Sequence, residues 1–449
     1  MHKFDQDMEV LAKAIVEYAV DRIRLDPPPI DGPKSAAELM AMAGQTITPD
    51  GLGGLEALRI FSEVLAPACL SVDHPRLLAF VPAAPTESAV LFDLVVGASS
   101  IFGGSWLEGS GAVYAENQAL RWIADLAGFP EEAGGAFVSG GTAGNLSALV
   151  AARHDWRRKN PDMINIRGLL ISSEGAHASI QQAADVMDAD LICVPGHRLT
   201  GVTVAAAIDK LPMDQRQRLF AVAATAGTTN VGIVDDIAGV ADVCERESLW
   251  LHIDGAYGGA ALAAPSVRAE FEGIERADSF IVDPHKWLFA PFDCCALLYR
   301  DPAAARRAHR QHGDYLDVLH DGEWNPSDYA HHLSRRARGL PLWFSLSTHG
   351  TAAYTEAVEQ TISIARQAAA LIEADDCLEM VLACHLSIVL FRRKGWTPEQ
   401  YTAWSDRLLG EGLGFVTTTK HDGETVLRFC VINPRTTIED IQLIVDTLH

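Results

Sequence analysis

The feature that most constrains the fold of this sequence is a series of short apolar segments separated by stretches with helical periodicity. The alternation begins near Ala112 and contains seven such segments, at residues 136–138, 168–171, 191–194, 219–224, 249–253, 279–282 and 295–298. Strands that alternate with helices predict a mainly parallel sheet covered by helices. Because the segments are almost entirely apolar, we expect both faces of the sheet to be buried. The sequence therefore predicts an α/β fold with a seven-stranded, mainly parallel sheet.

The regions on either side of this alternation predict two smaller units. An amphipathic helix at residues 8–23 is followed by a break at Pro27-Pro28-Pro29 and by a second helix at 55–65. After the alternation we expect a helix over 343–373, strands over 381–392 and 426–432, and a last helix over 437–448. With 449 residues the chain is long enough for two or three lobes. We expect an N-terminal helical segment at 1–78, a large α/β domain at 79–340 and a small α+β domain at 341–449.

A polar stretch rich in His, Asp and Arg ends the large domain. Such a long segment without clear periodicity is often a lid over a site, so we expect a mobile loop over about residues 309–338.

Charge and composition argue against several classes of partner. The formal net charge of −23 disfavours binding to nucleic acid or to anionic lipid surfaces. No segment approaches the ~18 consecutive apolar residues that a membrane span needs. The first residues lack the basic start and apolar centre of a secretion signal. The eight cysteines form no CxxC pair. We therefore expect a cytoplasmic protein with free thiols.

Polar residues cluster directly after the predicted strands. The five clusters are 139–145, 174–177, 225–229, Asp254 and 283–286. In open α/β sheets, ligands bind beyond the carboxyl ends of the strands. We therefore expect these clusters, which are scattered along the chain, to meet at one edge of the sheet.

The first cluster is a Gly-rich turn between a strand and a helix, Gly140-Gly141-Thr142-Ala143-Gly144-Asn145. Small residues at such a turn let backbone N–H groups approach an anion at the helix N-terminus. A turn without a ligand explains this segment equally well. The pattern is not GxGxxG, which weakens a dinucleotide interpretation.

Three single residues in the other clusters could carry chemistry. Asp254 could cap a helix, bind a metal, or hold the N–H of a pyridinium ring, for which the small Ala256 would leave room. Lys286 is followed by an apolar run, and we expect desolvation to lower its pKa so that the neutral amine can form an imine. His177 could be a base, a ligand or a partner that stacks on a ring.

The order of these elements resembles a known family. A Gly-rich turn, His177, Asp254-x-Ala256 and His285-Lys286 occur in this order in the group II decarboxylases that depend on pyridoxal 5′-phosphate (PLP), which act on aromatic amino acids, glutamate, histidine and related substrates. The most specific matching segments are 224–229, 251–259, and 277–280 leading into 284–287. The resemblance extends from His74-Pro75 to the C-terminal helix. It implies the aminotransferase-like fold-type I and a homodimer with active sites at the interface.

The resemblance also implies roles for individual residues. Lys286 would carry PLP as a Schiff base, Asp254 would pair with the pyridine nitrogen, and His177 would stack on the ring and orient the substrate carboxylate. Tyr329, in the polar loop, would return a proton to the substrate carbon, with Tyr315 as the rival. Residues implied to bind the cofactor are Gly141, Thr142, Ala143, Gly144, Asn145, His177, Thr225, Asp254, Ala256, His285 and Lys286. Residues implied on the substrate side are Phe80, Val81, Pro82 and His177.

The sequence departs from the aromatic decarboxylases at the substrate pocket. Val72 and Val81 stand where those enzymes carry Trp and Phe, and residues 103–106 replace a run with a bulky aromatic. An aromatic substrate is therefore favoured only weakly. Asp283 is Asn in many relatives, and we expect its carboxylate to turn away from a phosphate or to bond to a donor.

Other functions remain open at this stage. PLP chemistry on this fold also includes aldehyde synthases and other lyases. A tyrosine in the loop favours amine formation over the aldehyde-forming reaction, which goes with phenylalanine in plant relatives. An inactive relative that only binds other molecules is a candidate from a different class. We expect no metal, because the loop histidines His309, His312, His320, His331 and His332 lack HExxH spacing.

Overall fold

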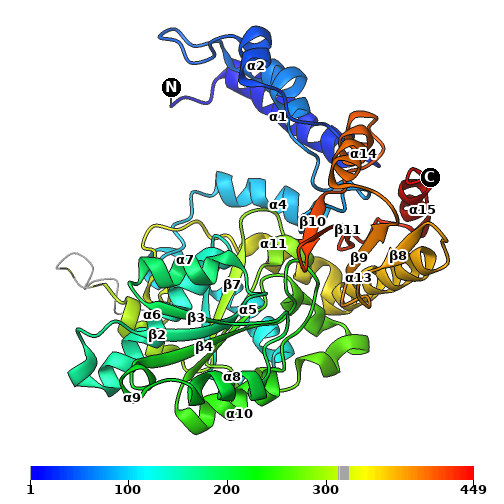
Figure 1. Cartoon of the computed structure of the whole chain (residues 1–449). Coiled ribbons are helices and arrows are strands. Elements are labelled where there is room, and N and C mark those ends of the chain that lie inside the picture. The colour runs from blue at the N-terminus through cyan, green and yellow to red at the C-terminus, as the bar shows by residue number, and fades with distance from the viewer. Residues whose placement is uncertain (1, 312, 314–322) are drawn as a thin grey trace.

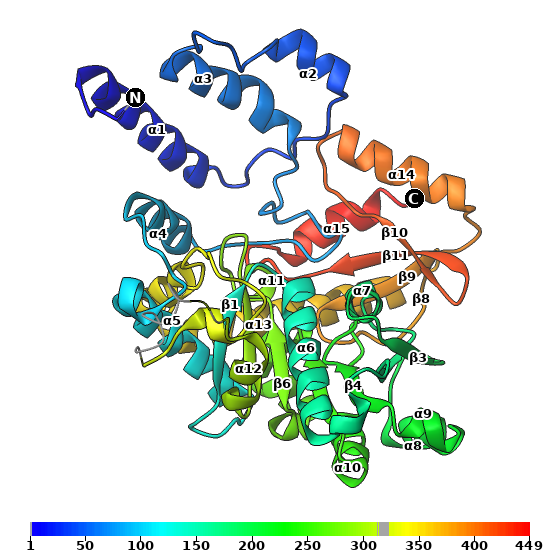
Figure 2. The same ribbon diagram turned by 90° about the vertical axis from the view of Figure 1, so that its left-hand side faces the viewer.

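The structure is a computed structural model that describes residues 2–311, 313 and 323–449. A helix-covered sheet forms the large body of the molecule, and a smaller sheet with its own helices lies beside it (Figure 1). The N-terminal helices extend away from the large body (Figure 2).

The large sheet has seven strands among the described residues, in the order β1-β7-β6-β5-β4-β2-β3. They are β1 (Gly134–Val138), β2 (Leu169–Ser173), β3 (Asp190–Val194), β4 (Leu219–Thr225), β5 (Trp250–Asp254), β6 (Ser279–Val282) and β7 (Cys295–Tyr299). Only β7 is antiparallel to its neighbours β1 and β6. The expected seven-stranded, mainly parallel sheet is confirmed, and each strand lies within two residues of its expected position.

Helices cover both faces of this sheet, as nearly all-apolar strands require. The helices of the large domain are α4 (Glu87–Ala98), α5 (Trp106–Leu126), α6 (Gly141–Lys159), α7 (Ala178–Val186), α8 (Gly201–Asp209), α9 (Met213–Arg216), α10 (Ile237–Glu247), α11 (Pro284–Trp287) and α12 (Pro302–His309). Every residue of β2, β4, β6 and β7 is buried. Helix α6 packs across β4, β5, β6 and β7, so its N-terminus faces the carboxyl edge of the sheet centre.

The small sheet has the order β10-β11-β9-β8 and is antiparallel throughout. Its elements are β8 (Leu378–Met380), β9 (Ile388–Arg393), β10 (Thr418–His421) and β11 (Glu424–Cys430), with α13 (Leu340–Glu373), α14 (Pro398–Gly410) and α15 (Ile438–Asp446). Of the strand expected at 381–392, only residues 388–392 are strand, as part of β9, and β8 ends just before the expected range. Neither β10 nor α14 was expected from the sequence.

The N-terminal segment is helical, as expected, with α1 (Gln6–Arg24), α2 (Ala36–Ala43) and α3 (Gly54–Ile60). No residue of α1 or α2 is buried. The segment ends close to the small domain, because the N–H of Leu78 donates to Phe415 and the carbonyl of Leu78 accepts from Cys430. Leu78 belongs to the apolar core of the small domain.

The mobile loop expected over about 309–338 stays a prediction, but several side chains in its described C-terminal half are packed in the large domain. Asn325, Asp328, Tyr329 and Ala337 are each no more than 5% exposed. The Tyr329 ring stacks on Trp324, with ring centres 4.2 Å apart. These four residues therefore pack into the large domain, whereas Glu323, His331 and Ser334 in the same segment are exposed.

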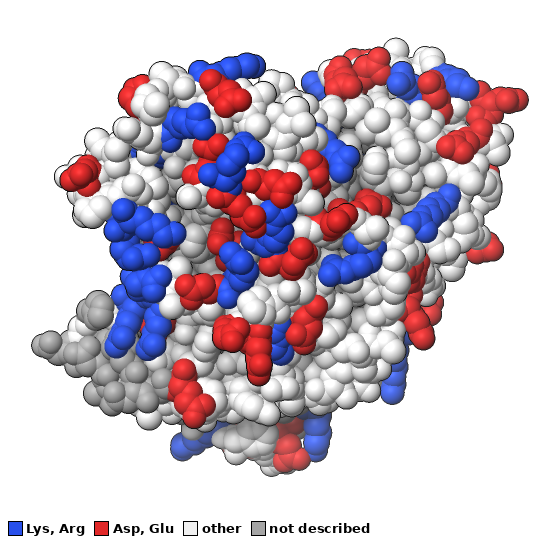
Figure 3. All heavy atoms as spheres, turned by 90° about the horizontal axis from the view of Figure 1, so that it is seen from below, with Lys and Arg blue, Asp and Glu red and all other residues white. Residues whose placement is uncertain are grey.

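In the part of the chain that the structure describes, no helix is long and apolar enough to cross a membrane. On the underside of the large domain, positive and negative side chains lie next to one another across most of the visible face (Figure 3).

Candidate active site

A cavity of about 370 Å³ lies at the carboxyl edge of the large sheet. Residues from all five predicted clusters line it, so the expected convergence at one edge is observed. The lining residues are Phe80, Val81, Gly140, Gly141, Thr142, Asn145, His177, Ser179, Thr225, Gly227, Thr229, Asp254, Ala256, Tyr257, Asp283, His285 and Lys286.

The Gly-rich turn forms one end of the cavity, where β1 leads into α6. A Cβ atom on Gly141 would lie 3.0 Å from the Cβ of Ala256, which is tighter than ordinary contact. Opposite this turn, Gly227 has a φ of +96°, and a Cβ there would lie 2.8 Å from the Cα of Gly258. These glycines keep the cavity open for a flat or anionic group.

Lys286 lies on α11 at the end of β6, and its amino group faces a carboxylate. Its Nζ is 2.9 Å from Oδ2 of Asp283, which is buried. The same oxygen accepts the backbone N–H of Gly141 at 3.3 Å. The expectation that Asp283 bonds to a donor is therefore confirmed.

The pKa of Lys286 differs from the sequence-based expectation. Burial acts to lower this pKa, as expected, but the charges of Asp283 and Asp254 outweigh burial. The net effect raises the pKa of Lys286 above its ordinary value. The expected lowering was wrong because it considered desolvation without the adjacent carboxylates.

Asp254 stands at the carboxyl end of β5, where both of its oxygens are held. Oδ1 accepts the backbone N–H of Ala256 at 3.0 Å. Oδ2 accepts from the side-chain amide of Asn145 at 2.8 Å. With both oxygens held, the plane of this carboxylate is fixed in the cavity wall.

His177 caps the N-terminus of α7. Its Nδ1 accepts the backbone N–H of Ser179 at 3.2 Å and lies 2.8 Å from the Ser179 hydroxyl. The imidazole is thereby fixed at one nitrogen by the start of its own helix.

A buried hydrogen-bond network connects Asp254 with His177 and continues to residues of β5 and β6. The Asn145 amide contacts Ser179 at 2.8 Å and His252 at 2.8 Å. His252 in turn lies 2.9 Å from the hydroxyl of Ser279, its register partner on β6. Ser279 also accepts the indole N–H of Trp250 at 2.8 Å. Burial lowers the pKa of His252 to about 4, although Asp254 acts in the opposite direction.

Sequence reasoning did not identify Ser179, His252 or Ser279 as functional residues. One signal was present for His252, which lies two residues before Asp254 and so shares its face of the strand. Ser279 pairs with it only through the sheet register.

Other predicted site residues are distributed as follows. Phe80 and Val81 line the cavity, whereas Pro82 is buried and does not line it. Ala143 and Gly144 are not among the lining residues; a Cβ on Gly144 would lie 2.9 Å from the side chain of Ile281. Tyr329 is packed in the core against Trp324 rather than at the cavity. Tyr315 lies outside the described residues.

Arg428 of β11 ties the small domain to the loops around the cavity, which the sequence did not suggest. It is buried and donates to the carbonyls of Phe80, Thr229 and Asn230. Phe80 and Thr229 both line the cavity, so the small domain helps to set its shape.

The residues of the cavity fit the cofactor that the resemblance implies. Lys286 supplies an amine, Asp254 supplies a fixed carboxylate, and the turn at Gly140–Thr142 supplies a helix N-terminus without bulky side chains. The one unfavourable element is the Asp283 carboxylate near that turn, and its contact with Lys286 offsets this charge.

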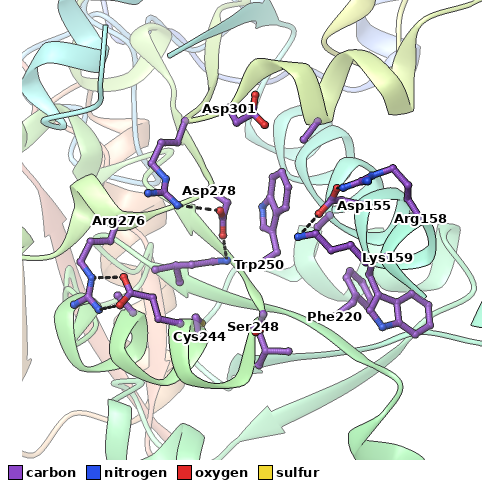
Figure 4. Close-up of a pocket in the computed structure, with 18 of the residues that line it drawn as sticks. Asp155, Arg158, Lys159, Phe220, Cys244, Ser248, Trp250, Arg276, Asp278 and Asp301 are labelled. Atoms are coloured by element: carbon purple, nitrogen blue, oxygen red, sulfur yellow. Dashed lines mark hydrogen bonds and ion pairs between the residues drawn. The ribbon is translucent and has the colours of Figure 1, made fainter. Parts of the chain in front are cut away.

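A second cavity, of about 520 Å³, lies at the opposite edge of the large sheet (Figure 4). Most of its charged residues are paired with one another. Asp155 binds Arg158 and Lys159, Arg276 binds Glu245, and Asp278 accepts from Leu251 and Arg300. Because these charges are already paired, this cavity should bind a charged ligand less well than the first cavity does.

Comparisons with known proteins agree with this geometry. The pyridoxal-dependent decarboxylase conserved domain matches residues 55–394. The aromatic-L-amino-acid decarboxylase of Bacillus atrophaeus is 31% identical over 455 residues, covering 97% of this chain and 93% of that protein. The histidine decarboxylase of Mus musculus is 29% identical over 403 residues, covering 84% of this chain and 60% of that protein.

Solved structures share the fold. The crystal structure of Oryza sativa TDC with PLP and tryptamine has a TM-score of 0.92 at 24% identity, covering 100% of this chain and 99% of that one. The Rhodiola rosea 4-hydroxyphenylacetaldehyde synthase has a TM-score of 0.86 at 22% identity, covering 98% and 97%. The fold is therefore the expected fold-type I, and the chain belongs to the family of pyridoxal-dependent decarboxylases, carboxy-lyases whose cofactor is PLP.

Proposed function

We propose that this enzyme removes CO₂ from an L-amino acid to give the corresponding amine, with an aromatic amino acid as the favoured substrate. The observation that carries the proposal is the convergence of Lys286, Asp254 and His177 on one cavity. When bound at Lys286, PLP supplies an electron sink for the bond that breaks at the substrate α-carbon. The residues of the chain then decide which bond that is.

Asp254 acts on the cofactor ring. Its carboxylate, fixed by Asn145 and by the N–H of Ala256, accepts the N–H of the pyridine nitrogen and so keeps that nitrogen protonated.

His177 acts on the substrate. With Nδ1 engaged by Ser179, the other ring nitrogen is left for the cavity, where it can orient the substrate carboxylate. A carboxylate held perpendicular to the cofactor ring is the group that leaves, which favours decarboxylation over loss of the α-proton.

Completion of the reaction needs a proton at the α-carbon, and two tyrosines were candidates. The position of Tyr329 does not support this role, because its ring is packed against Trp324 and burial raises the pKa of its hydroxyl to about 12. Tyr315 stays a prediction.

The substrate preference rests on the relatives. An aromatic-L-amino-acid decarboxylase covers nearly the whole chain, and the histidine decarboxylase matches a smaller part of it. Val81 in the lining leaves more room than a bulky aromatic side chain would. A screen of all proteinogenic amino acids, DOPA and 5-hydroxytryptophan for CO₂ release tests the proposal. If only glutamate or another acidic amino acid reacted, the aromatic preference would be wrong.

An aldehyde synthase remains the second candidate, because one solved structure with this fold is such an enzyme. The products separate the two activities: a decarboxylase gives amine and CO₂, whereas the aldehyde-forming reaction also gives hydrogen peroxide. Peroxide in proportion to CO₂ would favour the second candidate. A protein that takes up no PLP would instead support the inactive alternative.

We also propose that the enzyme works as a homodimer, in which the N-terminal helices pack against a second copy. Helices α1 and α2 bury no residue against their own chain. They carry exposed apolar side chains, among them Val10, Val16, Met40 and Met42. Burial of such a surface is favourable, and it matches the homodimer that the resemblance implies. Light scattering should give twice the chain mass, and Val16→Glu should shift this toward the monomer. The cytoplasmic location stays a prediction.

A further inference from the structure

We propose that Asn145 is a positioning residue whose one amide orients the Asp254 carboxylate and, through Ser179, holds His177 as the neutral tautomer with its proton on Nε2. The inference rests on the proposed function and deepens it, because it states which form of His177 meets the substrate.

The carboxylate of Asp254 can only accept hydrogen bonds. The NH₂ end of the Asn145 amide must therefore face Oδ2 of Asp254, at 2.8 Å. Its second N–H reaches the Ser179 hydroxyl oxygen, also at 2.8 Å. The carbonyl end of the amide is then the group that faces His252.

The branch through His252 confirms that this orientation is consistent. His252 Nε2 lies 2.8 Å from the Asn145 carbonyl oxygen, so Nε2 must carry a proton and donate it. Burial lowers the pKa of His252 to about 4, so the ring is neutral and its Nδ1 accepts. The donor is the Ser279 hydroxyl at 2.9 Å, whose own oxygen accepts from the Trp250 indole at 2.8 Å. Every donor in this branch meets an acceptor.

The branch through Ser179 reaches the substrate side. Since the Ser179 oxygen receives an N–H from Asn145, its hydrogen is available for His177 Nδ1 at 2.8 Å. The backbone N–H of Ser179 donates to the same nitrogen at 3.2 Å. A nitrogen that accepts from two donors cannot itself carry a proton. His177 is therefore neutral, with its single proton on Nε2.

This tautomer suits the release of CO₂. A neutral N–H orients a carboxylate through a hydrogen bond without the added attraction between two opposite charges. The carboxylate loses its charge as it leaves, so an imidazolium would stabilise the ground state more than the transition state. The network thus lets His177 orient the substrate carboxylate without forming an ion pair with it.

The network is buried, which makes its proton arrangement hard to change. Asn145, Ser179, His252 and Ser279 are each no more than 2% exposed. An unpaired polar group at this depth is costly, so the fully paired arrangement is strongly preferred. Asn145 is the one residue that belongs to both branches.

The first test measures binding of pyridoxamine 5′-phosphate to the cofactor-free protein, because this molecule carries the ring but cannot attach to Lys286. Asn145→Leu keeps similar bulk and removes both branches. It should weaken binding roughly ten-fold or more, the usual effect of losing a hydrogen bond to a charged group. Ser179→Ala leaves the Asp254 contact intact and should stay within about two-fold, as should the matched control Trp250→Phe at the far end of the network.

The second test observes the tautomer directly in the PLP-loaded enzyme labelled with ¹⁵N-histidine, with the His177 signals identified by their loss in His177→Gln. Near neutral pH, Nδ1 should have the shift of an unprotonated nitrogen and Nε2 that of a protonated one. Asn145→Leu should shift both signals toward a mixture of tautomers, whereas Trp250→Phe should not. Protonation of Nδ1 in the unmodified protein would overturn the inference.

Each remaining outcome also decides the question. If Asn145→Leu does not fold, Asn145→Ser, which is too short to reach both partners, should show the same weakened binding. Equal binding by folded Asn145 variants and the unmodified protein would refute the positioning role. Neither test uses turnover, so a failed substrate screen with both results intact would reject the proposed function alone.

Discussion

Replacing Asp283 with Asn should speed the covalent attachment of PLP to Lys286 near neutral pH. Attachment needs the uncharged amine. In the structure, the buried carboxylate of Asp283 lies 2.9 Å from the Lys286 amino group and favours its charged form. Together with Asp254 it raises the pKa of Lys286 against the effect of burial. His285 and Cys295 also face this pair. Without the Asp283 charge, the effect of burial is opposed less strongly, so the pKa of Lys286 falls.

The size of the effect follows from the contact that is lost. A hydrogen bond to a charged group contributes about 1.5–3 kcal/mol, and about 1.4 kcal/mol corresponds to ten-fold in an equilibrium. The uncharged fraction of Lys286, and with it the attachment rate, should therefore rise about ten-fold to a hundred-fold at a fixed pH below the pKa. Since the rate increases with pH as the amine loses its proton, the rate–pH curve of Asp283→Asn should lie at lower pH than that of the unmodified protein.

The assay follows the visible absorbance of the imine after the cofactor-free protein is mixed with aldehyde, from about pH 6 to about pH 9. Asp283 also contacts Gly141 at the turn that would hold the phosphate of PLP. Asp283→Asn can therefore change phosphate binding as well as the pKa of Lys286. Pyridoxal without a phosphate isolates the effect on Lys286. Asp278→Asn is the matched control, because this half-buried carboxylate lies at the opposite sheet edge. If the pyridoxal curves of Asp283→Asn and the unmodified protein coincide, the reasoning is refuted.

Three further substitutions test other parts of the molecule. Lys286→Ala should bind PLP without a bond that borohydride can reduce and should release no CO₂; residual reducible imine would place the attachment elsewhere. Tyr329→Phe should leave the amine yield within about two-fold, because the Tyr329 ring is stacked on Trp324 and does not line the cavity, and a ten-fold fall would restore Tyr329 as the acid. Glu116→Gln should cost about 3–5 kcal/mol of unfolding free energy, because Glu116 and Arg335 form a buried ion pair at 2.7 Å. Denaturant unfolding measures this cost, and an unchanged midpoint would contradict it.

The parts of this fold that could be predicted from the sequence depend on local patterns. All seven strands of the large sheet are short apolar runs between Gly-rich or charged segments. Runs of this kind are typical of strands that are buried on both faces of a parallel sheet. The convergence of Lys286, Asp254 and His177 followed from the rule that parallel strands present their carboxyl ends at one edge.

The parts that could not be predicted depend on contacts between distant segments. Strand β10 is short and partly exposed, so its apolar signal is weak and only pairing with β11 defines it. Tyr329 occupies a polar stretch of sequence but is buried by Trp324 and the adjacent core. Nothing in the local sequence links Ser179 with His252, and only the fold places Asn145 of α6 between them.

Asp254 and Asp283 show why residue type and strand position do not determine a chemical role. Both are buried carboxylates at the carboxyl ends of neighbouring parallel strands. Asp254 is held by an amide and a backbone N–H, neither of which titrates, so its orientation does not change with pH. Asp283 is paired with Lys286, whose charge would change on the proposed attachment of the cofactor. The first carboxylate is therefore suited to hold a ring nitrogen through every turnover, whereas the second acts mainly on the amine before attachment. This difference is set by which donors the fold brings to each side chain.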